Sequence, residues 1–154
     1  MASFQHSTDQ SPQGGRQKRY FTLADANRSL VLVKRIVADV VTEYSRLLDL
    51  QELADAAQAN EDCQRAENAH AELAATAEKL RCCLEELDDM GVLLTDWSVG
   101  MVDFPSLVNG REVQLSWRCG EPQVCYWRDT HSGSKGRQPI ETLLTDPALT
   151  IGGR

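Results

Sequence analysis

The stretch VDFPSLVNGREVQLSWRCGEP, residues 102–122, decides the fold of this chain. From residue 112 to residue 118 the chain alternates strictly, which places three apolar side chains on one face: Val113, Leu115 and Trp117. Asn109-Gly110 before this run is a strong signal for a two-residue hairpin turn. The stretch therefore predicts antiparallel strands with one apolar face and one face that carries charge.

Further strands are predicted on both sides of this hairpin. Val92 and Leu94 alternate in a short strand, and residues 100–103 form another, with Pro105 expected to stop the pairing. Downstream, residues 124–128 alternate again after the turn formed by Gly120 and Pro122. The region as a whole predicts an antiparallel meander of three or four strands.

Two long amphipathic helices precede the strands. Thr22 and Asp25 resemble a capping box, and from there apolar residues recur in steps of three and four: Leu23, Ala26, Leu30, Val33, Val37, Val40, Tyr44 and Leu47. A second such register follows: Ala66, Ala69, Leu73, Thr76, Leu80, Cys83, Leu87 and Met90. Residues 60–62 form the turn between the helices, and Gly91 ends the second. Helices of about 25 to 30 residues are longer than any strand, so one end of the hairpin should project past the sheet.

The domain organisation follows from these elements. Residues 1–19 are rich in Ser, Gln and Gly, and we expect them to be disordered. Residues 20–140 form a single α+β domain, with the helical hairpin at about 22–90 and the β-region at about 91–128. Residues 141–154 are a C-terminal extension. The predicted fold is a long antiparallel helical hairpin packed on a small antiparallel β-sheet.

The composition of the 154 residues excludes some classes of function. A formal net charge of −7 argues against general nucleic-acid binding, which needs a basic face. No apolar run approaches the roughly 20 residues that span a bilayer, and the N-terminus lacks the apolar core of a signal peptide. The five cysteines show no paired spacing that would indicate a disulfide framework. These features favour a protein of the reducing cytoplasm.

Charged residues are unusually dense among the predicted strands, and they form our candidate site: Asp103, Arg111, Glu112, Arg118, Glu121 and Arg137. In one interpretation these side chains pair across neighbouring strands and fix the strand register. In a second, Arg111, Arg118 and Arg137 present planar charged groups to a small anion, and Trp117 with the other tryptophans walls the pocket. A third makes the region a surface for protein interaction.

The same residues resemble a known family. The runs GVLLTDWSVGMVDFP, NGREVQLSWRCGEP and YWRDTHSGSKGRQPI, together with the FTLADAN entry into the first helix, are similar to small bacterial proteins known as domain of unknown function 2203. The resemblance covers about residues 20–140. It implies a helical hairpin with a small β-region and transfers no activity.

Rival functions remain open at this point. An enzyme would use His131 with Asp103 or Asp129 as an acid–base pair, but the chain has no recognised catalytic motif. We expect no cofactor and no metal, since Glu67-Asn68-Ala69-His70 occurs as a single copy without a partner motif. A homo-oligomeric scaffold would associate through the projecting hairpin. The sequence favours a binding or interaction module.

Overall fold

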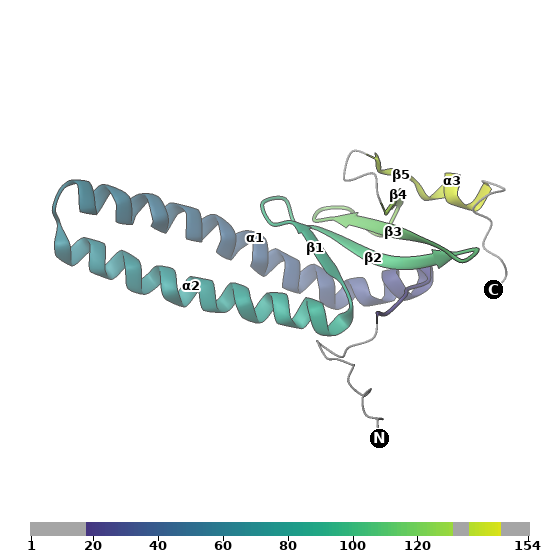
Figure 1. Ribbon diagram of the computed structural model, residues 1–154, viewed down its shortest axis with the longest axis horizontal. Helices are drawn as coiled ribbons and strands as arrows, with labels where there is room; N and C mark the ends of the chain where they lie inside the picture. The colour runs from purple at the N-terminus through teal and green to yellow at the C-terminus, as the bar shows by residue number, and fades with distance from the viewer. Residues whose placement is uncertain (1–17, 131–135, 146–154) are drawn as a thin grey trace, which may run out of the picture.

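A computed structural model describes residues 18–130 and 136–145 of the chain. Two helices, α1 (Leu23–Ala59) and α2 (Cys63–Met90), form the predicted hairpin. Figure 1 shows it as the long axis of the molecule, with its tip projecting well beyond the sheet. The 37 residues of α1 exceed the predicted length and correspond to about 55 Å at a rise of about 1.5 Å per residue. Within the described residues, no helix has both the length and the apolar character needed to cross a membrane.

Local signals define the ends of both helices, as predicted. The Thr22 side chain accepts from the backbone N–H of Asp25 at 3.0 Å, and the Asp25 carboxylate accepts from the backbone N–H of Thr22 at 3.3 Å. Gly91 adopts φ 85° at the end of α2, a left-handed conformation that glycine adopts without strain. The capping box and the C-terminal glycine are therefore confirmed.

Replacing Thr22 with alanine is expected to lower the free energy of unfolding by about 1 kcal/mol, because the capping box loses its side-chain acceptor. Thr42 provides the matched control, since it is exposed in the middle of α1. Thr42→Ala should be neutral or slightly stabilising, because alanine is the better helix former. Urea unfolding of both variants measures the difference. Equal losses in the two variants would contradict the capping role.

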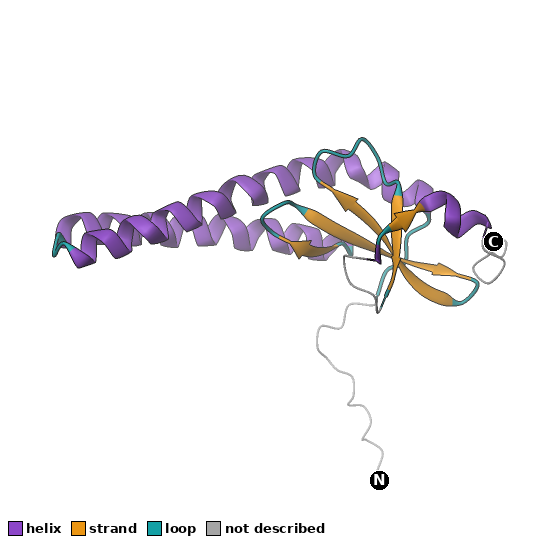
Figure 2. Cartoon of the chain, turned by 90° about the horizontal axis from the view of Figure 1, so that it is seen from above, coloured by secondary structure: helices purple, strands orange, loops and turns teal. Residues whose placement is uncertain are grey.

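Five strands form one antiparallel sheet in sequence order, one more than the upper limit predicted. They are β1 (Leu93–Asp96), β2 (Met101–Val108), β3 (Arg111–Arg118), β4 (Tyr126–Asp129) and β5 (Gln138–Pro139), and the short helix α3 (Ile140–Thr145) follows. Figure 2 shows the strands fanned across one half of the hairpin, while the other half extends free of the sheet. The predicted turn at Asn109-Gly110 is confirmed, with φ of 56° and 78°.

The prediction that Pro105 stops the pairing is wrong, because β2 continues to Val108. The carbonyl of Pro105 points away from β3 and accepts from the backbone N–H of Phe21 at 2.7 Å. In an extended strand the N–H of a residue lies on the same side as its carbonyl. An N–H at position 105 would therefore point away from β3. Proline lacks this N–H, but no hydrogen bond between β2 and β3 is lost.

The core lies between α1 and the face of the sheet that carries Val102, Phe104, Val113, Leu115 and Trp117. Leu143 of α3 is also buried in this core, so the domain extends beyond the predicted boundary at residue 140. At the other end, Lys18 and Arg19 belong to the described structure, although the sequence assigns them to the tail; residues 1–17 lie outside it. All five cysteines are free.

Candidate functional site

The face of the sheet turned away from α1 is polar. Asp103 of β2 lies opposite Ser116 of β3, and Ser116 lies opposite Tyr126 of β4. One row along, Gln114 of β3 lies opposite Arg128 of β4. Because side chains alternate along a strand, these five residues project from the same side of the sheet. We call them the polar face.

An ion pair between Arg128 and Asp103 occupies the centre of the polar face. The Asp103 side chain is 1% exposed and that of Arg128 is 13% exposed. Burial raises the pKa of the Asp103 carboxyl above its usual value, although the hydrogen bond and charge of Arg128 and the charge of Arg137 act in the opposite direction. Desolvation therefore outweighs the attraction of the two arginines at this carboxyl group.

Arg137 reaches the polar face from the segment before β5. Its Nε donates to Ser116 Oγ at 2.9 Å, its Nη2 donates to Glu121 Oε1 at 2.9 Å, and its guanidinium lies 4.4 Å from the centre of the Tyr126 ring. Desolvation acts to raise the pKa of Glu121, but the hydrogen bonds from Arg137 and from the backbone N–H of Arg118 lower it overall. Glu121 therefore remains ionised and neutralises Arg137.

Two further groups of charges lie at the rim of the sheet. Glu112 accepts from Lys18 Nζ at 2.7 Å and from the Tyr20 hydroxyl at 3.1 Å, and the hydrogen bond from Lys18 lowers the pKa of Glu112. Arg111 pairs with Asp129. Because these groups are more exposed than the central pair, each contributes little to stability.

Two buried oxygen atoms on the polar face have no hydrogen-bond partner. They are Asp103 Oδ1 and Gln114 Oε1, while Asp103 Oδ2 is bonded to Arg128 and Gln114 Nε2 donates to Glu112. A third such atom, Glu43 Oε1, belongs to α1. Unsatisfied buried acceptors are rare in native proteins. The described residues thus leave two acceptors on adjacent strands of the polar face without a donor.

The predicted site is brought together only in part. Asp103, Glu121 and Arg137 meet on or beside the polar face, with Glu112 at its rim. Arg111 and Arg118 stand at opposite ends of β3, and seven steps of about 3.3 Å separate their backbones by about 23 Å. The three arginines therefore cannot hold one small anion between them, and that part of the prediction is wrong.

The tryptophans do not wall the polar face. Trp117 is buried in the apolar core, since alternation places it on the opposite side of β3 from Ser116, and it meets the charged residues through Nε1, which donates to the Glu121 carbonyl at 2.9 Å. Trp127 also belongs to the core, and Trp97 packs edge-on against Tyr44 of α1. The expectation of an aromatic pocket is corrected accordingly.

Sequence reasoning missed the residues at the centre: Gln114, Ser116, Tyr126 and Arg128. Gln114 and Ser116 alternate with the core residues of β3 and so fall on the opposite face of the strand. In the structure both are buried. One signal was available, since alternation puts Tyr126 and Arg128 on one face of β4. A buried carboxylate such as Asp103 requires a cation, and Arg128 supplies it.

Two other predictions concern a catalytic role for His131 and the absence of a metal site. His131 lies outside the described residues, so its relation to Asp103 or Asp129 is not described. Across residues 18–130 and 136–145, no three His, Cys, Asp or Glu side chains gather in a way that could hold a metal ion.

Comparison with known proteins identifies the family of this chain. No curated protein and no solved structure matches the chain. A family model described as "Uncharacterized conserved protein (DUF2203)" matches residues 19–140, which include both long helices, all five strands and the polar face. The capped hairpin, the five-stranded sheet and its buried polar face are thus the structure of a member of DUF2203, the family to which this chain belongs.

Proposed function

We propose that the protein is a binding module whose ligand site is the polar face, and that the ligand presents an ammonium or amide N–H group to Asp103 Oδ1 and Gln114 Oε1. The observation that carries the proposal is the pair of buried acceptors without donors. Leaving such an atom unsatisfied costs about 1–3 kcal/mol. A ligand that donates to both atoms recovers this free energy on binding.

The surrounding contacts suit this role. Arg128 holds Asp103 Oδ2, which fixes the direction of the carboxylate and leaves Oδ1 to a ligand. The negative charge strengthens a hydrogen bond from a cationic donor compared with a neutral one. Gln114 Nε2 donates to Glu112, which leaves the Gln114 amide oxygen, Oε1, to a ligand. Both acceptors are therefore oriented before a ligand binds.

An anionic group on the same ligand would find a cation nearby. Arg118 lies opposite Met101, so its exposed side chain leaves the sheet on the same side as Asp103, at a diagonal position about 7–8 Å away. The ligand that fits both features is a small zwitterion with an ammonium and a carboxylate close together. Of the three arginines predicted to bind a small anion, only Arg118 has that role in this proposal.

Amide resonances of the ¹⁵N-labelled full chain test the proposal, with glycine, methylammonium and acetate as probes. We expect glycine and methylammonium to shift the side-chain amide signals of Gln114. Asp103→Asn should remove both responses, whereas Asp96→Asn should retain them, because the Asp96 carboxylate serves the turn at Ser98 and Val99. Arg118→Ala should weaken glycine binding and leave the methylammonium response unchanged.

Two outcomes would overturn the proposal. If no probe shifts the Gln114 signals, a solvent molecule alone satisfies the two acceptors. If acetate shifts them and methylammonium does not, the site recognises an anion and the assignment of an N–H donor is incorrect.

A further inference from the structure

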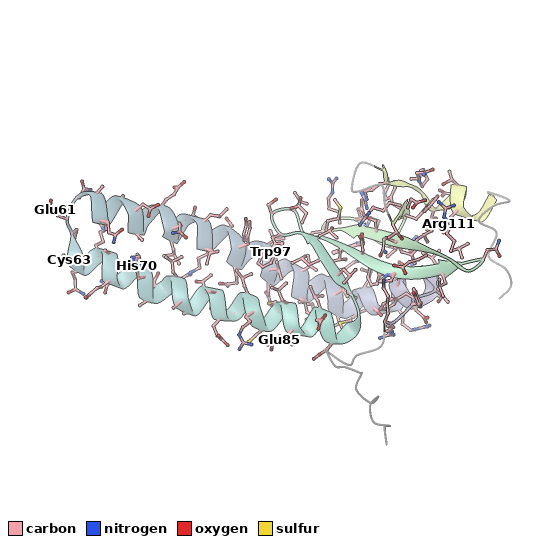
Figure 3. All side chains as sticks on the ribbon, viewed as in Figure 1. Glu61, Cys63, His70, Glu85, Trp97 and Arg111 are labelled. Carbon is pink, nitrogen blue, oxygen red and sulfur yellow. The ribbon has the colours of Figure 1, made fainter. Side chains whose placement is uncertain are left out.

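A groove runs between α2 and β1, along the opposite side of β1 from β2, with a volume of about 410 Å³. Its apolar wall comes from both elements: Leu84, Leu87, Val92, Leu93, Leu94 and Trp97. Figure 3 shows Trp97 beside β1 at the junction of hairpin and sheet, and Glu85 on α2. The groove lies beside the half of the hairpin that the sheet covers, not beside the projecting tip.

The groove follows the edge of the sheet. Leu93 pairs with Asp103 and projects on the side of the polar face, whereas Leu94 pairs with Val102 and projects toward the core. Neighbouring residues from opposite faces of a strand line one groove only when the groove lies along the strand's edge. Among residues 18–130 and 136–145, no strand pairs with β1 on the side away from β2. An unpaired edge of this kind is a template for an additional strand.

The rim of the groove is acidic. Glu85 and Asp88 lie on the α2 side, and the one basic residue of the lining, Arg81, is engaged by Glu78 and Glu85. Over its whole length α2 has seven acidic and three basic residues. A chain segment that enters the groove therefore meets a negative potential, which favours lysine and arginine over acidic residues.

We propose that an extended, basic segment of a partner protein adds to the free edge of β1. Its backbone continues the sheet, its apolar side chains enter the groove against Leu84 and Trp97, and its basic side chains meet Glu85 and Asp88. Strand addition gives affinity through main-chain hydrogen bonds and specificity through the pockets for alternate side chains. A second copy of this chain fits less well, because each copy carries a formal net charge of −7 and the two copies repel.

A synthetic peptide with alternating lysine and valine, six residues long and capped at both ends, is the probe. Trp117 and Trp127 are buried and Trp97 is partly exposed, so a change in tryptophan fluorescence on titration reports chiefly on the groove. We expect saturable binding of this peptide and slower hydrogen exchange of the β1 amides. A glutamate–valine peptide of the same length, and a lysine–valine peptide N-methylated at alternate residues, should bind at least tenfold more weakly.

Leu93→Lys tests the position of the groove, and Val31→Lys is its matched control. Both replace an exposed aliphatic residue, 44% and 75% exposed respectively, and both add the same charge, but Val31 is a residue of α1 outside the groove. Leu93→Lys should weaken peptide binding at least tenfold, while Val31→Lys should change it less than twofold. Circular dichroism confirms that both variants remain folded.

The proposal is overturned if the N-methylated or the acidic peptide binds as well as the lysine–valine peptide, or if the two lysine variants behave alike. It is also overturned if sedimentation without peptide shows a concentration-dependent dimer that Leu93→Lys abolishes, since a second copy would then occupy the edge.

Discussion

Replacing Arg128 with methionine is expected to lower the free energy of unfolding by about 3–5 kcal/mol, because the substitution leaves the buried Asp103 carboxylate without its cation. Methionine retains much of the length of arginine, so the loss reflects charge more than packing. Urea unfolding at neutral pH measures the effect. Arg118→Met is the matched control, and its exposed side chain predicts a change within about 0.5 kcal/mol.

The same variant has a defined dependence on pH. Burial already raises the pKa of Asp103 in the native protein, and removing Arg128 removes a hydrogen bond and a charge that lower it. A carboxyl group whose pKa is higher in the folded state than in the unfolded state binds its proton more tightly when folded. Its contribution to stability is therefore present at low pH and is lost as the pH rises through the folded pKa. The deficit of Arg128→Met relative to the native protein should therefore shrink as the pH falls from neutral.

The double variant Asp103→Asn/Arg128→Met separates charge from structure. It removes the buried carboxylate together with its partner, and we expect it to be more stable at neutral pH than Arg128→Met alone. Because the double variant lacks the carboxyl group, its deficit relative to the native protein should not shrink as the pH falls. If the double variant is no more stable than the single one, Arg128 acts through packing and the account of the central ion pair is incorrect.

Replacing Gly100 with alanine should destabilise the protein by about 2–5 kcal/mol, through two effects that add. Gly100 has φ 77°, a conformation that an L-residue adopts at a cost of about 1–2 kcal/mol. A Cβ at this position would also lie 2.7 Å from Val37 Cγ1 and 2.8 Å from Val41 Cγ2, both on α1. Gly100 therefore allows the loop between β1 and β2 to lie directly against the helix.

Gly110 is the matched control for this prediction. It has nearly the same φ, 78°, but an added Cβ would meet no atom within 4 Å. Gly110→Ala should therefore show the backbone cost alone, about 1–2 kcal/mol. Thermal and urea unfolding of the two variants isolate the packing contribution as their difference. Equal destabilisation would mean that α1 moves away from the loop at little cost.

Much of the fold is predictable from sequence because its signals are local. The capping box at Thr22, the glycine that ends α2 and the turn at Asn109-Gly110 each depend on a few neighbouring residues. The burial of Ala26, Leu30, Val33, Val37 and Val40 follows from the period of the helix. The exposure of Val31, Leu32 and Leu48 does not follow from the helix period. It depends on how much of α1 the sheet covers.

The candidate site is less predictable because its partners come from distant segments. Arg128 of β4 pairs with Asp103 of β2 across the intervening strand, and Arg137 reaches Ser116 and Glu121 from beyond β4. Charge density along residues 102–122 indicates that a polar cluster exists. Which carboxylate pairs with which guanidinium depends on strand order and register, and these are set by the tertiary fold.

The sequence by itself determined the helical hairpin, its turn, the central hairpin of strands around Asn109-Gly110 and the separation of an apolar face from a polar one, because caps, turns and periodicity act between near neighbours. The tertiary structure alone decided that the polar face is buried, that Pro105 is tolerated inside β2 and that two acceptors on that face lack donors. The physical reason is that desolvation and hydrogen-bond satisfaction depend on what covers an atom, and side chains from distant segments provide that cover.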